Sequence, residues 1–150
     1  MEDNVCIDAS LALAWLLPAE RNNTIDALFS EWNRKGVRLL TASLFHAEVA
    51  SSIRKQVYFK KLQPEQGEHL FTLYLRMQIE SIGEQEIYNR AWELAKRFNL
   101  PTTYDTQYLA VAELRDCELW TTDSRFINSL HGRVPRIKWA GEYNPERELQ

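Results

Sequence analysis

Residues Cys117–Phe126 read C-E-L-W-T-T-D-S-R-F, and this stretch decides the fold. Its first part, Glu118–Thr121, predicts a short buried strand, and the residues from Ser124 onward predict a helix. Asp123 stands between the two. Ligands of open α/β sheets bind just beyond the carboxyl ends of the strands, so an acid at this place is either a helix N-cap or part of a site.

The N-terminal part of the chain repeats this arrangement. Residues Val5–Ser10 read V-C-I-D-A-S, which predicts a buried central strand over Asn4–Asp8 and a helix from Ala9. Asp8 stands where Asp123 stands in the first stretch. Helix capping explains one acid at a strand end more easily than it explains two.

In the rest of the chain the apolar pattern alternates between helical and strand periods. This alternation predicts βαβ units and a parallel sheet that is covered on both faces. The predicted strands are Asn4–Asp8, Val37–Thr41, Gln78–Ile82, Glu118–Thr121 and Ile137–Ala140. The predicted helices are Ala9–Leu17, Asn23–Lys35, Ser43–Tyr58, one opened by Pro64, Glu84–Asn99, Asp105–Asp116 and Ser124–His131. We expect one domain over residues 1–150, with a frayed polar tail from about Asn144.

The composition, 45% hydrophobic and 26% charged over 150 residues, is typical of a soluble globular protein. No apolar run approaches the roughly 20 residues of a membrane helix, and the acidic start is not a secretory signal. We therefore expect a cytoplasmic protein without a membrane partner, in which Cys6 and Cys117 are buried, reduced thiols. The net charge of −3 argues against a protein that simply coats nucleic acid, but not against a nuclease whose acids bind metal ions.

The residues around the first strand argue against two enzyme classes. A dinucleotide-binding Rossmann domain would carry G-x-G-x-x-G there, and none of the five glycines lies in that region. A phosphatase that attacks through an aspartate would usually carry a second Asp two residues after Asp8. This chain has Ser10 at that position.

Four carboxylates are candidates for a site, and each has a simpler interpretation. Asp8 and Asp123 could cap the helices that follow them. Glu48 lies away from the apolar stripe of its helix, where an exposed Glu is common. Asp105 starts the inward stripe that includes Tyr108, so it either needs a partner or a metal ion or caps its helix.

If these acids converge, they repel one another and require cations. Oxygen ligands without His or Cys partners favour Mg²⁺ or Mn²⁺ over zinc. Such ions lower the pKa of water and offset charge on phosphorus, which is the chemistry of phosphodiester hydrolysis. The hydroxyls of Ser10 and Thr121 could support the carboxylates or a ligand, and ordinary hydrogen bonding at turns is the alternative for each.

Four motifs follow one another along the chain: V-C-I-D-A-S, A-S-L-F-H-A-E-V, Y-D-T-Q-Y-L-A-V-A-E and L-W-T-T-D-S-R-F. Together they resemble PIN-domain proteins, most closely the VapC-type ribonuclease toxins of toxin–antitoxin pairs, from about Val5 to about Ala140. The resemblance implies a three-layer α/β/α sandwich on a central, mostly parallel sheet. It also implies a Mg²⁺ or Mn²⁺ site with Thr121 as a supporting hydroxyl. The implied ligands are Asp8, Glu48, Asp105 and Asp123.

The same resemblance implies a function and partners. It implies a metal-dependent endoribonuclease that cleaves RNA, forms a homodimer and is silenced by a cognate antitoxin protein. At two positions the chain departs from the family pattern, so the resemblance does not determine the form of the substrate channel. The family often has Pro before the helix that carries Glu48, where this chain has Thr41 and Ser43, and it usually has Ala where this chain has Thr106.

Other functions and contacts also remain open from the sequence. A PIN-fold scaffold with weak or no catalysis that binds RNA or protein is one alternative, and an RNA-maturation nuclease is another. Arg54 and Lys55, close to the aromatic Tyr58, could line a path for single-stranded RNA, with a solvated helix end as the alternative. Arg125 could contact a phosphate or be an ordinary surface arginine.

Overall fold

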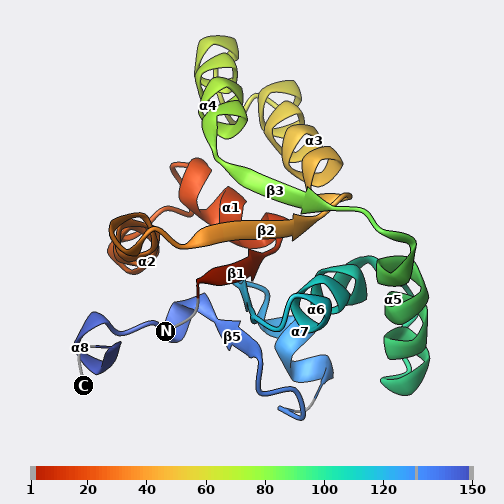
Figure 1. The fold of residues 1–150 in the computed structure, drawn as a ribbon. Helices are drawn as coiled ribbons and strands as arrows, with labels where there is room; N and C mark the ends of the chain where they lie inside the picture. Colours follow the sequence, from red (N-terminus) through yellow and green to blue (C-terminus); the bar gives the residue numbers. More distant parts are fainter. Residues whose placement is uncertain (1–2, 131, 149–150) are drawn as a thin grey trace.

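The computed structural model describes residues 3–130 and 132–148 of the chain. Within these residues lies a five-stranded sheet in the order β3-β2-β1-β4-β5, and each pair of neighbouring strands is parallel (Figure 1). The strands are β1 (Asn4–Ile7), β2 (Arg38–Ala42), β3 (Ile79–Ile82), β4 (Glu118–Thr121) and β5 (Ile137–Trp139). The predicted parallel sheet is therefore confirmed.

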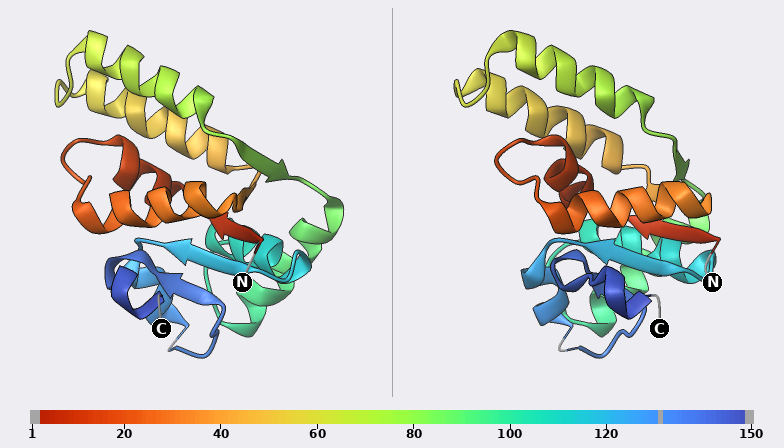
Figure 2. Two further views of the ribbon diagram at one scale, coloured as in Figure 1. Left: turned by 60° about the vertical axis from the view of Figure 1, so that its left-hand side comes forward. Right: turned by 90° about the vertical axis from the view of Figure 1, so that its left-hand side faces the viewer.

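Helices cover both faces of this sheet (Figures 1 and 2). They are α1 (Ala9–Leu16), α2 (Asn23–Lys35), α3 (Phe45–Tyr58), α4 (Pro64–Arg76), α5 (Gln85–Arg97), α6 (Tyr104–Leu114), α7 (Ser124–Ser129) and α8 (Pro145–Glu148), with a 3₁₀ helix, η1 (Ala140–Glu142). α6 contacts β1, β2 and β4, and α5 packs against α6. α1 contacts β4 and packs against α2, α3 and α4. This arrangement confirms the α/β/α sandwich.

Local residue chemistry explains where the strands and helices form and end. Residues 5–7 of β1 are apolar and buried on both faces, as expected for a strand between two helical layers. α2 shows how single residues set helix ends. The Asn22 side chain accepts a hydrogen bond from the Ile25 amide at 3.0 Å, and Gly36 ends the helix with a φ of 68°.

The structure departs from the predictions mainly near the C-terminus. The last strand ends at Trp139, one residue early, and η1 follows it. Within the polar tail expected from about Asn144, Pro145–Glu148 form the short helix α8. α7 ends at Ser129, whereas His131, the predicted end of that helix, and residues 149–150 of the tail lie outside the described residues.

One expectation from composition has a structural counterpart. The side chains of Cys6 and Cys117 are buried, as predicted. In the part of the chain that the structure describes, no helix combines the length and the apolar character that crossing a membrane requires.

α3 and α4 form a close hairpin whose contact depends on Gly67. A Cβ atom built on Gly67 would lie 2.3 Å from Cγ2 of Val57. α4 can therefore approach α3 only because position 67 has no side chain. The hairpin occupies the upper part of the molecule in both views of Figure 2.

Replacing Gly67 by Ala is expected to lower the free energy of unfolding by about 1–3 kcal/mol, the usual cost of overpacking. The loss is expected even though Ala is favoured over Gly inside a helix by about 1 kcal/mol. Val57→Ala should destabilise the Gly67→Ala variant less than it destabilises the parent, because it removes the clashing methyl group. Urea denaturation measures both effects.

Gly83→Ala is the matched control for this prediction. A Cβ atom at Gly83 would meet the Cβ atom of Ser43 at 3.8 Å, which is ordinary contact. We expect this variant to be close to the parent in stability. A Gly67→Ala variant as stable as the parent would contradict the close contact between the helices.

Candidate active site

The order of the strands creates the place for a site. The chain builds β2 and β3 on one side of β1 and then β4 and β5 on the other, so the strand order reverses between β1 and β4. In sheets of this type, ligands bind beyond the carboxyl ends of the strands at such a switch point. Asp8 follows β1 and Thr121 ends β4, so both lie at this point.

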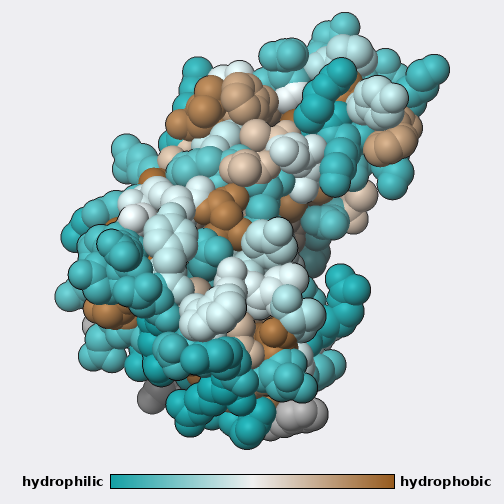
Figure 3. Space-filling view, turned by 90° about the vertical axis from the view of Figure 1, so that its right-hand side faces the viewer, coloured by the Kyte–Doolittle hydropathy of each residue, from teal (hydrophilic) through white to brown (hydrophobic). Residues whose placement is uncertain are grey.

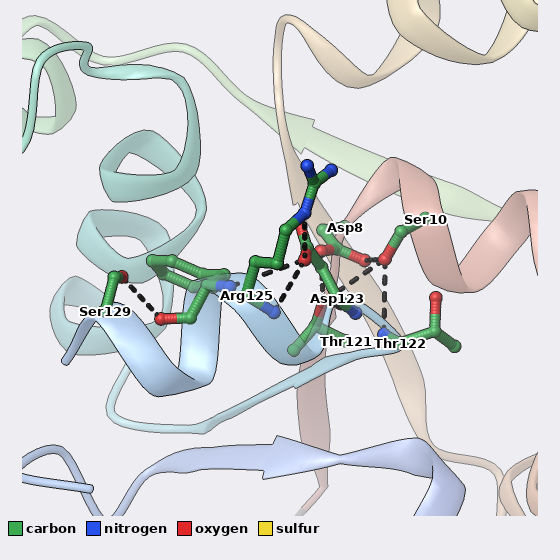
Figure 4. A network of polar contacts seen from close by, with 8 residues as sticks. Asp8, Ser10, Thr121, Thr122, Asp123, Arg125 and Ser129 are labelled. Carbon is green, nitrogen blue, oxygen red and sulfur yellow. Dashed lines mark hydrogen bonds and ion pairs between the residues drawn. The ribbon is translucent and has the colours of Figure 1, made fainter. Parts of the chain in front are cut away.

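Asp8 is buried at the switch point. Its Oδ1 accepts hydrogen bonds from Ser10 Oγ at 2.7 Å and from the Leu11 amide at 3.0 Å. Its Oδ2 accepts a hydrogen bond from Thr121 Oγ1 at 2.5 Å (Figure 4). The carboxylate therefore caps α1, as one interpretation predicted, and at the same time joins α1 to the end of β4.

The two hydroxyls tie this carboxylate into the neighbouring strand end. Ser10 Oγ and Thr121 Oγ1 lie 3.2 Å apart, although they are 111 positions apart in the chain. The Thr122 amide donates to Ser10 Oγ at 3.2 Å, and the Asp123 amide donates to Thr121 Oγ1 at 3.0 Å. These bonds are more than local turn contacts, because they fix the start of α1 against the start of α7.

Asp123 begins α7 beside the same network. Its Oδ1 accepts hydrogen bonds from the amides of Arg125 at 3.0 Å and Phe126 at 3.4 Å, so Asp123 is also an N-cap. Nε of Arg125 lies 3.8 Å from this oxygen, and the Arg125 side chain is 94% exposed. Figure 4 shows the Arg125 side chain beside Asp123 at the start of α7.

Asp105 lies half-buried in the first turn of α6. The N-cap of α6 is Thr103, so the interpretation that Asp105 caps its helix is wrong. Within the described residues, the Asp105 carboxylate makes no hydrogen bond or ion pair. Burial first, and then the charges of Asp123 and Glu48, raise the pKa of Asp105 to about 6, against an opposing effect of Arg125.

The pKa of Asp8 is also raised to about 6, and burial is the main cause. Hydrogen bonds from Thr121, Ser10 and Leu11 lower it, and the charge of Asp105 raises it. Asp105 is thus within electrostatic reach of each of the other three acids. The structure therefore brings all four carboxylates to the same edge of the sheet.

Glu48 reaches this edge from the first turn of α3. It is exposed, as its helical position predicted, but its Oε1 accepts a hydrogen bond from the Tyr108 hydroxyl at 2.8 Å. Burial, followed by the charge of Glu48, raises the pKa of Tyr108, so the hydroxyl stays a donor. The sequence places Tyr108 on the inward stripe of its helix, one turn after Asp105, but does not predict its contact with Glu48.

The donor set suits a hydrated divalent cation. It consists of carboxylate and hydroxyl oxygens, which favour Mg²⁺ and Mn²⁺. Among residues 3–130 and 132–148, however, no three Asp, Glu, His or Cys side chains form a group that could hold a metal ion directly. Mg²⁺ usually keeps several waters and binds through one or two carboxylates. An ion bound partly through water fits this arrangement, and the role of the four acids as ligands stays a prediction.

The predicted RNA contacts on α3 lie away from the acids. Arg54 and Lys55 come six and seven residues after Glu48, roughly 9–10.5 Å along the helix axis. Arg54 lies over the Tyr58 ring, 6.0 Å from its centre, and lines a cavity of about 380 Å³ next to α4. The structure does not bring these residues to the acidic edge, and their contact with RNA stays a prediction.

The raised pKa values predict a stability contribution that falls as the pH rises. Asp8 and Asp105 bind protons more tightly in the folded chain than in the unfolded one. Their contribution is therefore fully present below their ordinary pKa of 3.8 and is lost as the pH rises through about 6. In EDTA, urea denaturation should show the decrease in this range, and Asp105→Asn should make it smaller.

Asp116→Asn is the control for this pH dependence, because the Asp116 side chain is 97% exposed. It should leave the slope of stability against pH unchanged. The interpretation fails if the parent and the Asp105→Asn variant show the same pH dependence.

Solved structures of other proteins share this fold. A chain of the toxin–antitoxin complex from Klebsiella pneumoniae matches with a TM-score of 0.66 at 16% identity, over 91% of this chain and 97% of that one. FitAcB from Neisseria gonorrhoeae matches with a TM-score of 0.67 at 14% identity, over 93% and 99%. VapBC2 from Rickettsia felis, bound to a DNA fragment from its promoter, matches with a TM-score of 0.66 at 13% identity, over 91% and 96%. At these identities the matches establish the fold.

Proteins with similar sequences and a family model indicate the family of this chain. A VapC ribonuclease of Mycobacterium bovis and ribonuclease VapC9 of Mycobacterium tuberculosis are each 28% identical to this chain over 131 residues, which is 87% of this chain and 94% of theirs. The family model described as PIN domain matches residues 5–129, the region that holds all four carboxylates. This chain therefore belongs to the PIN domain family, as the resemblance of its four motifs predicted.

Proposed function

We propose that this chain is a metal-dependent endoribonuclease and the toxin of a toxin–antitoxin pair, formed by one domain over residues 1–150. One observation carries the proposal: carboxylates from the starts of four helices, α1, α3, α6 and α7, lie at the carboxyl edge of the sheet. Similarity to VapC ribonucleases and to chains of toxin–antitoxin complexes supports it.

The acids would hold a Mg²⁺ or Mn²⁺ ion, partly through water. Asp8, Asp105 and Asp123 are the proposed ligands, and Glu48 completes the set or orients the attacking water. When bound, such an ion offsets the charge that develops on the phosphate and lowers the pKa of water. The mutual repulsion of the acids at this edge is the physical reason to expect a cation there.

The chain's own residues prepare this edge before RNA binds. Ser10 and Thr121 hold the Asp8 carboxylate in one orientation, so its charge needs little rearrangement during the reaction. Tyr108 holds Oε1 of Glu48, which leaves Oε2 to accept a hydrogen bond from the attacking water. Arg125, which is highly exposed beside Asp123, can donate to phosphate oxygens.

The proposal includes RNA as substrate, a cognate antitoxin, a second copy of the chain, and a cytoplasmic location. Exposed apolar side chains at the α3–α4 hairpin support a protein partner, since large apolar groups rarely gather on a free surface. Tyr58 and Phe59, whose ring centres lie 5.0 Å apart at the end of α3, are 67% and 64% exposed. Figure 3 shows the face toward which the strands run, with brown apolar atoms among hydrophilic ones in its upper part, where α3 and α4 lie.

A scaffold of the same fold with weak or no catalysis is the second candidate. It is favoured by the observation that no three potential ligands among the described residues are grouped for direct contact with one ion. Metal binding separates the two candidates, because a scaffold does not require an ion at this edge.

Calorimetric titration with Mn²⁺ should show saturable binding that Asp105→Asn weakens at least tenfold. Loss of a residue that only supports a ligand already costs about 10–100-fold in metal affinity, so loss of a ligand should cost at least as much. With Mg²⁺, Asp8→Asn should reduce RNA cleavage by about 100-fold or more, because it removes one of the four negative charges proposed to hold the ion.

Asp116→Asn, which alters an exposed acid, should keep both metal binding and cleavage. Parental cleavage by Asp8→Asn would end the metal-site proposal. Absence of Mn²⁺ binding in the parent, or binding unchanged in Asp105→Asn, would favour the scaffold.

Tyr108→Phe removes only the hydroxyl that holds Glu48. We expect kcat to fall roughly tenfold or more, because a hydrogen bond to a charged group is worth about 1.5–3 kcal/mol, while KM changes little. The losses from Tyr108→Phe and Glu48→Gln should not add, since both act through one contact. Steady-state cleavage of a short RNA measures the four combinations, and fully additive losses would contradict a positioning role for Tyr108.

A further inference from the structure

A cavity of about 470 Å³ opens beside the acids on the side of α1. Its lining includes Ser10 and Thr122, which belong to the hydrogen-bond network that holds Asp8. Figure 4 shows both residues on the side of Asp8 that faces α1. The cavity therefore borders the hydrogen-bond network that holds Asp8.

Trp139 gives this cavity an aromatic wall. In the parallel pair of β4 and β5, Trp139 stands directly beside Thr121, and residues paired in this way point to the same face of the sheet. A Cβ atom on Gly141 would lie 2.8 Å from two atoms of the indole ring, so the ring lies against the Gly141 backbone. Trp139 is still 39% exposed, which leaves part of the ring open to a ligand.

Polar groups with spare hydrogen-bonding capacity complete the lining. The Glu20 side chain makes no hydrogen bond or ion pair within the part of the chain that the structure describes. Asn22 uses its Oδ1 to accept from the Ile25 amide, and its NH₂ group remains available as a donor. An aromatic ring together with free donors and acceptors is how proteins recognise unpaired bases.

We propose that this cavity holds one unpaired nucleobase of the RNA, next to the phosphate on which the acids act. The inference rests on the proposed ribonuclease function and adds the part of the substrate that this chain selects. The volume falls within the range of about 300–1,000 Å³ that is usual for pockets of small ligands.

The chemistry of the lining also predicts which base is preferred. The Glu20 carboxylate accepts hydrogen bonds and donates none, so it favours an exocyclic amino group such as that of cytosine. Uracil presents a carbonyl oxygen at the same position and is disfavoured. Glu20 lies inside the matched residues 5–129 of the family model, whereas Trp139 and Gly141, which form the stacking wall, lie beyond them.

Fluorescence anisotropy with short single-stranded RNAs, measured in EDTA, tests the inference without requiring cleavage. The probes are oligouridine and a series of strands of the same length. Each strand in the series carries a single cytosine, at a different position. The parent should bind best when cytosine occupies one particular position. Trp139→Ala and Gly141→Ala should weaken binding about tenfold, because base–aromatic stacking is lost or displaced, whereas Trp139→Tyr should keep most of it.

Glu20→Gln should leave the affinity for oligouridine nearly unchanged and reduce the preference for cytosine, because an amide can pair with either base. Trp92→Ala is the control, since Trp92 is a 60% exposed tryptophan of α5 that does not line this cavity. The inference is overturned if the Trp139, Gly141 and Glu20 variants all bind with parental affinity and base preference. A parent that binds RNA with this pattern but cleaves none would instead contradict the ribonuclease proposal and leave the base pocket standing.

Discussion

The candidate site depends on one buried carboxylate. A charge taken out of water is costly unless hydrogen bonds replace the lost hydration, and Asp8 receives them from Ser10, Leu11 and Thr121. These donors come from α1 and from the end of β4. The hydrogen bonds that satisfy Asp8 therefore also hold the start of α1 against the end of β4. The interpretations of Asp8 as a helix cap and as a site residue are therefore compatible, and the same holds for Asp123.

The sequence predicts most of the fold because the inner strands are apolar on both faces. Apolar runs such as residues 5–7 and 119–120 can be buried only between two layers, and a glycine such as Gly36 is typical of a helix end. The C-terminal segment was not predictable in this way. Its path depends on the close packing of Trp139 against Gly141, which is a tertiary contact and leaves no periodic pattern.

The site was partly predictable for the same physical reasons. Asp8 and Asp123 stand out because parallel strands end at one edge, so acids just beyond two strands can be compared without any structure. Glu48 has no such signal, since its helical position is that of an ordinary surface residue. The contact that sets it apart comes from Tyr108, 60 positions away, so only the resemblance of the motifs to the PIN family indicated it.

α3 connects two regions that have different neighbours. Its first turn carries Glu48, and its far end, closed onto α4 at Gly67, carries the exposed Tyr58. The helix runs without interruption from Phe45 to Tyr58, so one continuous element joins the acidic edge to the exposed surface. A protein bound at Tyr58 would contact the same helix that presents Glu48 to the Tyr108 hydroxyl.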